Sequence, residues 1–202
     1  MGRLVVATTN RGKVREIASL LSGTDIELLS LSDFPSLPPL AEEGNTFEDN
    51  AKSKALQAAG YTGLACIADD SGIEVDFLGG APGVYSARFS GPGATDASNN
   101  AKLIGLLRHV PAEKRTARFR AVVVLAVPGR VVDVSEGVLE GIVLELPRGS
   151  GGFGYDPLLY IPALGKTVAE LSLEEKNEIS HRAQALKGLL PSIMQLLGAG
   201  KL

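Results

Sequence analysis

Two adjacent aspartates follow a short apolar segment and could perform metal and acid–base chemistry. Asp69 and Asp70 come directly after residues 65–68 and precede Ser71 and Gly72. Neighbouring side chains of an extended chain point to opposite faces, so one carboxylate can reach a cleft while the other supports the structure. Carboxylate oxygens suit Mg²⁺, which takes one or two of them together with water and substrate phosphates. A capped turn is the alternative, but the position at the end of a predicted strand favours function.

A polar segment of six residues lies between a predicted strand and a predicted helix. Backbone N–H groups at a helix N-terminus, with a lysine beside them, can bind phosphate. The segment lacks the G-x-x-x-x-G-K-S/T pattern of a Walker A loop. Taken alone, it is interpreted as an ordinary turn in which Asn10 caps the helix and Lys13 is solvated. The six residues are Thr8, Thr9, Asn10, Arg11, Gly12 and Lys13.

An acidic segment leads into a predicted helix that carries an amide and an ammonium group. Asn50 and Lys54 are four residues apart and therefore share one face of this helix. Glu42, which precedes the helix, could supply a second carboxylate to a metal ion. An equally weighted alternative has Lys52 and Lys54 solvated and the glutamates in a polar loop.

Glycine and aromatic residues are concentrated in the segment 149–157. A glycine-rich backbone allows the close approach of a flat ligand, and Phe153 or Tyr155 could stack on it. A flexible turn is the alternative. Asp156 precedes a proline directly before an apolar strand, and this restricted conformation favours a binding loop.

Three basic residues fall on a helix that Ser172 and Glu175 are predicted to cap. His181 and Arg182 are adjacent and cannot share one direction fully, and Lys176 lies nearer the start of the helix. On its own, this group is interpreted as a solvated helix face.

Strands and helices alternate early in the chain, and strands cluster later. Apolar periodicity and capping residues set the expected ranges. The expected strands are 4–8, 26–31, 65–68, 73–75, 118–127, 131–134, 138–146 and 158–161, and the expected helices are 14–21, 47–59 (ending at Gly60), 96–108 and 173–190, with a further short helix from Pro191. We therefore expect one α/β domain, residues 1–202, with a mixed sheet and helices on its faces.

The composition fits a single soluble domain. Apolar residues make up 45% of the 202 residues, and 20 Lys and Arg against 23 Asp and Glu give a net charge of −3. This mild acidity argues against a nucleic acid partner, which requires a basic face. No apolar run is long enough to predict a membrane span. Cys66, the one cysteine, gives no sign of an oxidising compartment, so the expected location is the cytoplasm.

Six segments, taken in order, closely resemble the inosine triphosphate pyrophosphatase family, the non-canonical purine nucleoside triphosphate pyrophosphatases. They are 4–13 (LVVATTNRGK), 42–51 (EEGNTFEDNA), 67–72 (IADDSG), 79–88 (GGAPGVYSAR), 151–157 (GGFGYDP) and 180–182 (SHR). The resemblance covers nearly the whole chain. It implies an elongated, mixed central sheet flanked by helices, and a homodimer.

The same resemblance implies Mg²⁺-dependent hydrolysis of inosine, deoxyinosine and xanthosine triphosphates to the monophosphate and pyrophosphate, which clears them from the nucleotide pool. It assigns Asp70 as general base and metal ligand, and Lys54 as a catalytic residue. The second metal ligand is Glu42 rather than Glu43, by spacing. The residues implied to bind substrate are Thr8, Thr9, Asn10, Arg11, Gly12, Lys13 and Ser71 for the phosphates, and Phe153, Gly154, Tyr155, Asp156, Lys176, His181 and Arg182 for the base.

Other functions stay open from the residues themselves. An aspartyl-phosphate phosphatase also places acids after a strand, but it would release orthophosphate from monophosphates through a nucleophilic aspartate. A non-catalytic nucleotide-binding module would use the same loops without turnover, an alternative that the presence of Asp70, Lys13 and Lys54 weakens. A pyrophosphatase for modified pyrimidines would differ in the base pocket.

Overall fold

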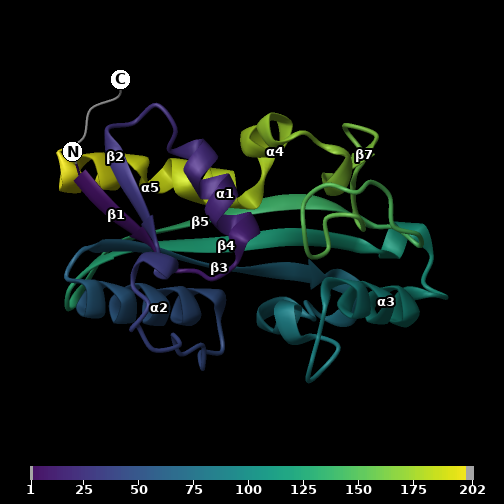
Figure 1. Ribbon diagram of the computed structural model, residues 1–202. Coiled ribbons are helices and arrows are strands. Elements are labelled where there is room, and N and C mark those ends of the chain that lie inside the picture. The colour runs from purple at the N-terminus through teal and green to yellow at the C-terminus, as the bar shows by residue number, and fades with distance from the viewer. Residues whose placement is uncertain (1, 199–202) are drawn as a thin grey trace. The chain divides into compact units, whose positions relative to one another are not determined.

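The structure, a computed structural model, describes residues 2–198 (Figure 1). Its strands are β1 (Gly2–Val6), β2 (Ile26–Ser30), β3 (Ala65–Val75), β4 (Thr116–Val127), β5 (Arg130–Val143), β6 (Leu159–Ile161) and β7 (Lys166–Thr167), and its α-helices are α1 (Arg11–Leu20), α2 (Phe47–Thr62), α3 (Asp96–Leu107), α4 (Leu173–Ile179) and α5 (His181–Leu197). None of the helices in this range is both long and apolar enough to span a bilayer.

The strands form a mixed sheet. Their hydrogen-bonded order is β2-β1-β3-β4-β5-β6-β7. β1 pairs in parallel with β2 and β3, whereas β6 pairs antiparallel with β5 and β7. The expected α/β class, with a mixed sheet flanked by helices, is confirmed.

The chain forms two compact units, each built from separate segments of the sequence. Among the described residues, unit 1 consists of 2–70, Ala121–Gly137 and 181–198, and unit 2 of Ser71–Arg120 and Val138–Ser180. The boundaries fall inside β3, β4 and β5, so these strands contribute to both units. The expectation of one domain over residues 1–202 stays a prediction.

In unit 1, helices cover both faces of the strands. Figure 1 shows α1 and α5 on one face and α2 on the other. Leu4 and Val6 of β1 belong to the apolar cluster that contains Ile17 of α1 and Leu186 of α5. The intervening Val5 is also fully buried, as expected for a strand covered on both sides. Adjacent side chains of a central strand therefore meet different helices.

Unit 2 has its own apolar core. Leu103 and Leu107 of α3 pack in one cluster with Ile73 of β3. Tyr155 and Leu158 belong to the same cluster. The glycine-rich segment is therefore anchored in this core at its C-terminal end.

The helix α2 begins and ends at residues with clear capping roles. The Thr46 side chain accepts the backbone N–H of Asp49 over 3.0 Å. The helix continues through Gly60 and stops at Gly63, whose φ of 70° is left-handed. The expected end at Gly60 is wrong, because the left-handed conformation that terminates a helix occurs three residues later.

Two strands are longer than expected. β3 runs without a break from Ala65 to Val75, so the expected strand end at residues 69–72 is wrong. Both aspartates find cationic partners on the facing helices, which allows the backbone to stay in the sheet. β5 similarly joins the expected strands 131–134 and 138–146 into one, but it ends at Val143, so the expected end at residue 146 is wrong.

The C-terminal helical region divides at Ser180 and not at Pro191, which corrects the expectation. Ser180 has an extended conformation, with φ −65° and ψ 152°, and ends α4. Pro191 lies inside α5. The helix continues past it because Leu189 and Ile193, on either side of the proline, are fully buried.

Gly137 in β5 is expected to tolerate no side chain, because α5 begins against it. A Cβ here would overlap the His181 carbonyl oxygen and lie 2.8 Å from the Ala185 nitrogen. We expect Gly137→Ala to lower the free energy of unfolding, measured in urea, by about 1–3 kcal/mol. The matched control, Gly60→Ala inside α2, meets nothing within 4 Å and should raise it by about 0.5–1 kcal/mol. Effects of the same sign would contradict the close approach.

Candidate active site

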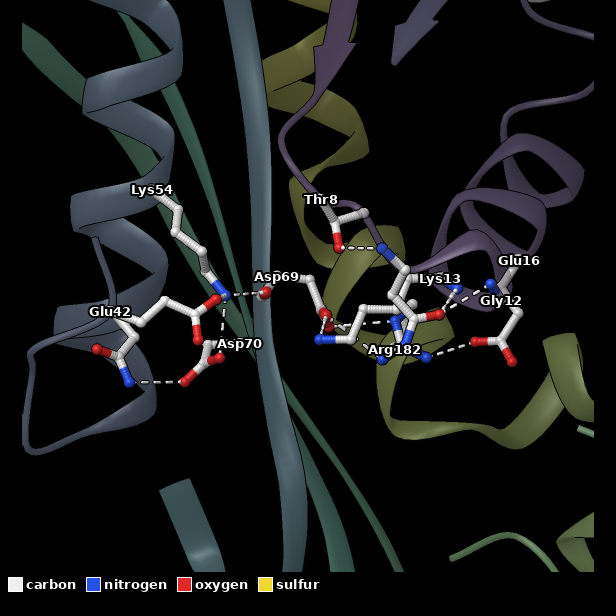
Figure 2. A network of polar contacts seen from close by, with 11 residues as sticks. Thr8, Gly12, Lys13, Glu16, Glu42, Lys54, Asp69, Asp70 and Arg182 are labelled. Atoms are coloured by element: carbon white, nitrogen blue, oxygen red, sulfur yellow. Dashed lines mark hydrogen bonds and ion pairs between the residues drawn. The ribbon is translucent and has the colours of Figure 1, made fainter. Parts of the chain in front are cut away.

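The two adjacent aspartates of β3 point to opposite faces of the strand. Figure 2 shows Asp70 on the side of Lys54 and Glu42, and Asp69 on the side of Lys13 and Arg182. Ile67 packs with α1 and α5, and Asp69, two residues further along the strand, shares that face. The two side-chain carboxylates therefore lie beside different cationic groups, all of them in unit 1.

On one face, a lysine and an asparagine of α2 bind the Asp70 carboxylate. Lys54 Nζ donates to Asp70 Oδ1 over 3.0 Å and to the Asp69 carbonyl oxygen over 2.8 Å. Asn50 Nδ2 donates to Asp70 Oδ2 over 3.1 Å. Lys54 and Asn50 are both buried, so the alternative of a solvated Lys54 is wrong.

Asn50 shares the helix face of Lys54, as its spacing predicts, but it is not among the expected site residues. Its Oδ1 accepts the backbone N–H of Gly44 over 2.8 Å, which orients Nδ2 towards Asp70. Its spacing of four residues from Lys54 is the signal that could have identified it.

The surroundings shift the pKa values of both Asp70 and Lys54. Burial raises the pKa of Asp70 above its ordinary value, and the ammonium group of Lys54 offsets this only in part. Burial opposes the charge of Lys54, but the carboxylates of Asp70, Glu42 and Asp69 together outweigh burial and raise the pKa of Lys54. A carboxylate with a raised pKa is a better proton acceptor, which suits a general base.

The oxygen atoms on this face fit a hard divalent cation. Lys54 Nζ lies 3.0 Å from both Glu42 Oε1 and Asp70 Oδ1, so the two carboxylates converge on one cationic position. The Glu42 side chain is 43% exposed and can reach water. Within residues 2–198, no three His, Cys, Asp or Glu side chains form a metal-binding group. Two carboxylates, completed by water and phosphate oxygens, are a ligand set typical of Mg²⁺.

On the other face, Asp69 belongs to a buried cluster of two acids and two bases. Asp69 pairs with Lys13 of α1 and accepts Arg182 Nε of α5 over 3.1 Å. Arg182 also pairs with Glu16 of α1. Arg182 is 1% exposed, so its interpretation as part of a solvated face is wrong.

The charges of this cluster keep Asp69 ionised. Burial alone would raise the pKa of Asp69, but Arg182 and Lys13 outweigh it and hold that pKa well below its usual range. Burial lowers the pKa of Lys13, and Asp69 opposes this change. Asp69 is therefore a counter-ion, and Asp70 is the better candidate for accepting a proton.

The polar turn before α1 begins the helix as expected. Asn10 Oδ1 accepts the backbone N–H groups of Gly12 (2.8 Å) and Lys13 (3.2 Å), and Thr8 Oγ1 accepts the N–H of Asn10 (3.2 Å). Because these caps occupy the N–H groups, attraction for a phosphate here depends mainly on the Lys13 charge and the helix dipole. Lys13 pairs with Asp69, so the alternative of a solvated Lys13 is wrong. The exposed residues of the segment are Thr9, Asn10 and Arg11.

A second cluster, in unit 2, joins the glycine-rich segment to α4. Asp156 Oδ2 accepts the backbone N–H of Phe153 over 3.0 Å and Lys176 Nζ over 2.6 Å. Lys176 Nζ also lies 4.9 Å from the centre of the Phe153 ring, within cation–π range. Lys176 is 4% exposed, so it does not belong to a solvated helix face.

Tyr155 is a core residue. It is buried, and its hydroxyl donates to the Ser86 carbonyl oxygen over 2.8 Å. Burial, with a contribution from Asp96, raises the pKa of this hydroxyl. The half-buried Phe153 is the ring of this segment with appreciable exposed surface.

Three further residues that the sequence analysis expects to bind substrate are Ser71, His181 and Gly154. Ser71 is half-buried and follows Asp70 along β3. His181 is buried and is the first residue of α5. Gly154 follows Phe153 with a left-handed φ of 60°.

The fold and these contacts define a class of protein. It is an α/β protein in which a central strand presents one carboxylate to each face, each beside an ammonium or guanidinium group. Such groups can neutralise a polyanion and hold a divalent cation.

The chain belongs to the Ham1 family, whose model matches residues 4–192. It is 56% identical over 186 residues to the dITP/XTP pyrophosphatase of Geobacter sulfurreducens, covering 92% of this chain and 94% of the relative. It is 53% identical over 188 residues to the protein of that name from Thermus thermophilus, covering 93% and 90%. The resemblance inferred from the sequence is confirmed.

Solved structures show the same fold. A HAM1 protein from Coxiella burnetii matches with a TM-score of 0.86 and 40% identity, covering 96% of this chain and 100% of that chain. A nucleoside-triphosphatase and dITP/XTP pyrophosphatase from Mycobacterium abscessus matches with a TM-score of 0.74 and 44% identity, covering 94% and 99%.

Proposed function

We propose that this chain hydrolyses the non-canonical purine nucleotides ITP, dITP and XTP to the monophosphate and pyrophosphate, and so removes them from the nucleotide pool. The names of its relatives support this substrate class. The observation that carries the proposal is the buried Asp70 carboxylate, bound by Lys54 and Asn50 with Glu42 beside them. Nucleotide pyrophosphatases generally need a divalent metal.

Asp70 is the proposed general base. It accepts the proton of the attacking water, while Lys54 and Asn50 each hold one of its oxygens. The ammonium group of Lys54 also stabilises negative charge that develops on the leaving pyrophosphate. Glu42 and Asp70 would hold Mg²⁺, which when bound supplies charge neutralisation at the phosphates.

Lys13 is the proposed phosphate ligand at the start of α1. Its ammonium group pairs with Asp69, and Asp69 has a second cationic partner in Arg182. Lys13 can therefore turn to a phosphate without leaving the buried Asp69 uncompensated. The segment from Thr8 to Lys13, with Ser71, completes the proposed phosphate side.

Phe153 and Lys176 are the proposed groups for base recognition in unit 2. Hypoxanthine and xanthine carry a carbonyl oxygen at C6 that accepts a hydrogen bond, whereas adenine carries an amine. Lys176 is a donor only, so it favours the carbonyl and would leave the adenine amine unpaired. Tyr155 and Asp156 support this segment from the core, and His181 and Arg182 stay assigned to base recognition as a prediction.

Glu42 and Glu43 offer a matched pair for testing the metal site. Both side chains are exposed, and Glu42 is the one of the two that forms an ion pair with Lys54. We expect Glu42→Gln to raise the Mg²⁺ concentration that gives half-maximal activity by at least about tenfold, since even residues behind a metal ligand have effects of this size. Glu43→Gln should leave the same titration unchanged. The opposite order would assign the ligand to Glu43.

The assembly and location of the chain are also proposed. We propose that the chain is a cytoplasmic homodimer and that each copy acts as one domain. We also propose that it has no nucleic acid or membrane partner. These proposals agree with the family resemblance. The net charge of −3 supports the absence of a nucleic acid partner. Cys66 is a free, buried thiol, which is in keeping with a reducing compartment.

Substrate selectivity tests the proposal. The purified protein is mixed with dITP, XTP, dATP or dGTP in the presence of Mg²⁺, and pyrophosphate release gives kcat/KM for each. We expect values for dITP and XTP that exceed that for dATP by on the order of 10²-fold or more, because a mismatched hydrogen-bonding group discriminates strongly. Equal values for all four nucleotides would overturn the proposed base recognition.

A further inference from the structure

The glycine between Phe153 and Tyr155 is held by a helix distant in sequence. Gly154 lies outside helices and strands, where its N–H and carbonyl groups need other partners. Its N–H donates to Asp96 Oδ2 over 2.7 Å, and its carbonyl oxygen accepts Asn100 Nδ2 over 3.0 Å. Both backbone groups of one residue are therefore bound by side chains of α3, within unit 2.

The geometry of α3 suits this role. Asp96 and Asn100 are four residues apart and so share one helix face. The helix start is capped independently, because Thr95 Oγ1 accepts the N–H of Ser98 over 3.1 Å. The buried Asn99 accepts the N–H of Ser90 over 2.8 Å and donates to the Ala87 carbonyl oxygen over 3.2 Å. These contacts make the first turns of α3 a rigid support for Gly154.

The amide group of Asn100 binds Gly154 through its nitrogen, while its oxygen lacks a hydrogen-bond partner among the described residues. Its Oδ1 is buried and has no hydrogen-bond partner among residues 2–198. A buried acceptor without a partner is destabilising. The hydrogen bond from Asn100 Nδ2 to the Gly154 carbonyl oxygen offsets part of this destabilisation.

The residues beside Gly154 are those proposed to recognise the base. The Phe153 N–H and Lys176 Nζ share the acceptor Asp156 Oδ2. The Tyr155 hydroxyl is fixed to Ser86. Gly154 connects Phe153 to the fixed Tyr155, so the backbone of Gly154 helps to set the direction in which the Phe153 ring points.

We propose that Asp96 and Asn100 are positioning residues for base recognition, and that they act by holding the backbone of Gly154 so that the Phe153 ring stays beside Lys176. This inference rests on the proposed function. It assigns a role in selectivity to two side chains that do not themselves contact the substrate.

Steady-state kinetics of Asp96→Ala and Asn100→Ala test the inference. We expect KM for dITP to rise about tenfold in each variant, the effect of losing one hydrogen bond of ordinary strength, with kcat changed much less. As KM for dITP rises, the ratio of kcat/KM for dITP to kcat/KM for dATP should fall. Asn100→Ala should keep the melting temperature, because it also removes the buried, unpaired Oδ1.

Two further measurements separate positioning from a general loss of structure. Asp96→Asn keeps an acceptor for the Gly154 N–H and should restore KM to near the unsubstituted value. Inorganic triphosphate, used as a competitive inhibitor, should keep its inhibition constant in all variants, because the proposed phosphate ligand Lys13 is unchanged.

The outcomes distinguish the inference from the proposed function. If the unsubstituted protein fails to hydrolyse dITP, the proposed function is overturned, and the inference with it. If it does hydrolyse dITP but both alanine variants keep its KM and selectivity, only the positioning role is overturned. An Asp96→Asn variant as defective as Asp96→Ala would also overturn that role.

Discussion

Asp70→Asn is expected to lower kcat for dITP hydrolysis by about 10²- to 10⁴-fold without unfolding the chain. The amide has the size of the carboxylate but cannot accept the proton of the attacking water. Lys54 and Asn50 still surround the position, so the substrate should bind. Pyrophosphate release measures kcat, and calorimetry measures the affinity for dITP.

The control for this substitution is the exposed Asp25. Asp25→Asn removes the same charge from the chain at a position away from the cluster around Asp70, and it should leave kcat unchanged. Undiminished turnover in Asp70→Asn would exclude Asp70 as the base. Loss of turnover together with loss of folded structure would contradict the isosteric argument.

Glu16→Ala is expected to lower the free energy of unfolding by about 3–5 kcal/mol, as breaking a buried ion pair does. Glu16 pairs with Arg182, and both side chains are almost completely buried. Without Glu16, the positive charges of Lys13 and Arg182 face the carboxylate of Asp69 in a buried cluster. Urea denaturation measures the change, and the melting temperature should fall by about 10 °C.

An exposed ion pair provides the matched control. Glu48 and Lys52 pair at a spacing of four residues on α2, with side chains 50% and 40% exposed. Glu48→Ala should cost no more than about 0.5 kcal/mol. Equally small losses for Glu48→Ala and Glu16→Ala would show that burial of the cluster around Arg182 adds nothing to stability.

Local patterns in the sequence were sufficient to predict much of the fold. The expected strands 4–8 and 26–31 correspond to β1 and β2, which run from Gly2 to Val6 and from Ile26 to Ser30. Ser172 and Glu175 predicted the capping box at the start of α4, which is present. These features depend on neighbours in the chain, so a single sequence contains them.

The predictions of strand ends are wrong where residues distant in the sequence determine the local structure. Consecutive aspartates favour the end of a strand unless their charges are compensated, and the compensating Lys13, Lys54 and Arg182 are remote in sequence from β3. The expected strands 131–134 and 138–146 likewise leave a gap around Gly137, whereas β5 runs through this glycine, which lies against the start of α5.

In the candidate site, too, some features follow from local geometry and others depend on residues distant in the sequence. The opposite directions of Asp69 and Asp70 followed from strand geometry alone, and the shared face of Asn50 and Lys54 followed from helix geometry. Glu16 had no local signal, because its burial depends on Arg182 at the other end of the chain. The contacts of Asp96 and Asn100 with Gly154 join residues more than fifty positions apart, which no local pattern predicts.

The identity of the products formed from dITP tests the proposed hydrolysis directly. The purified protein is incubated with dITP and Mg²⁺, and the phosphorus-containing products are followed by ³¹P NMR. The proposed hydrolysis predicts dIMP and pyrophosphate in equal amounts, with little product from dATP under the same conditions. Orthophosphate as the first product, or binding of dITP without turnover, would contradict it.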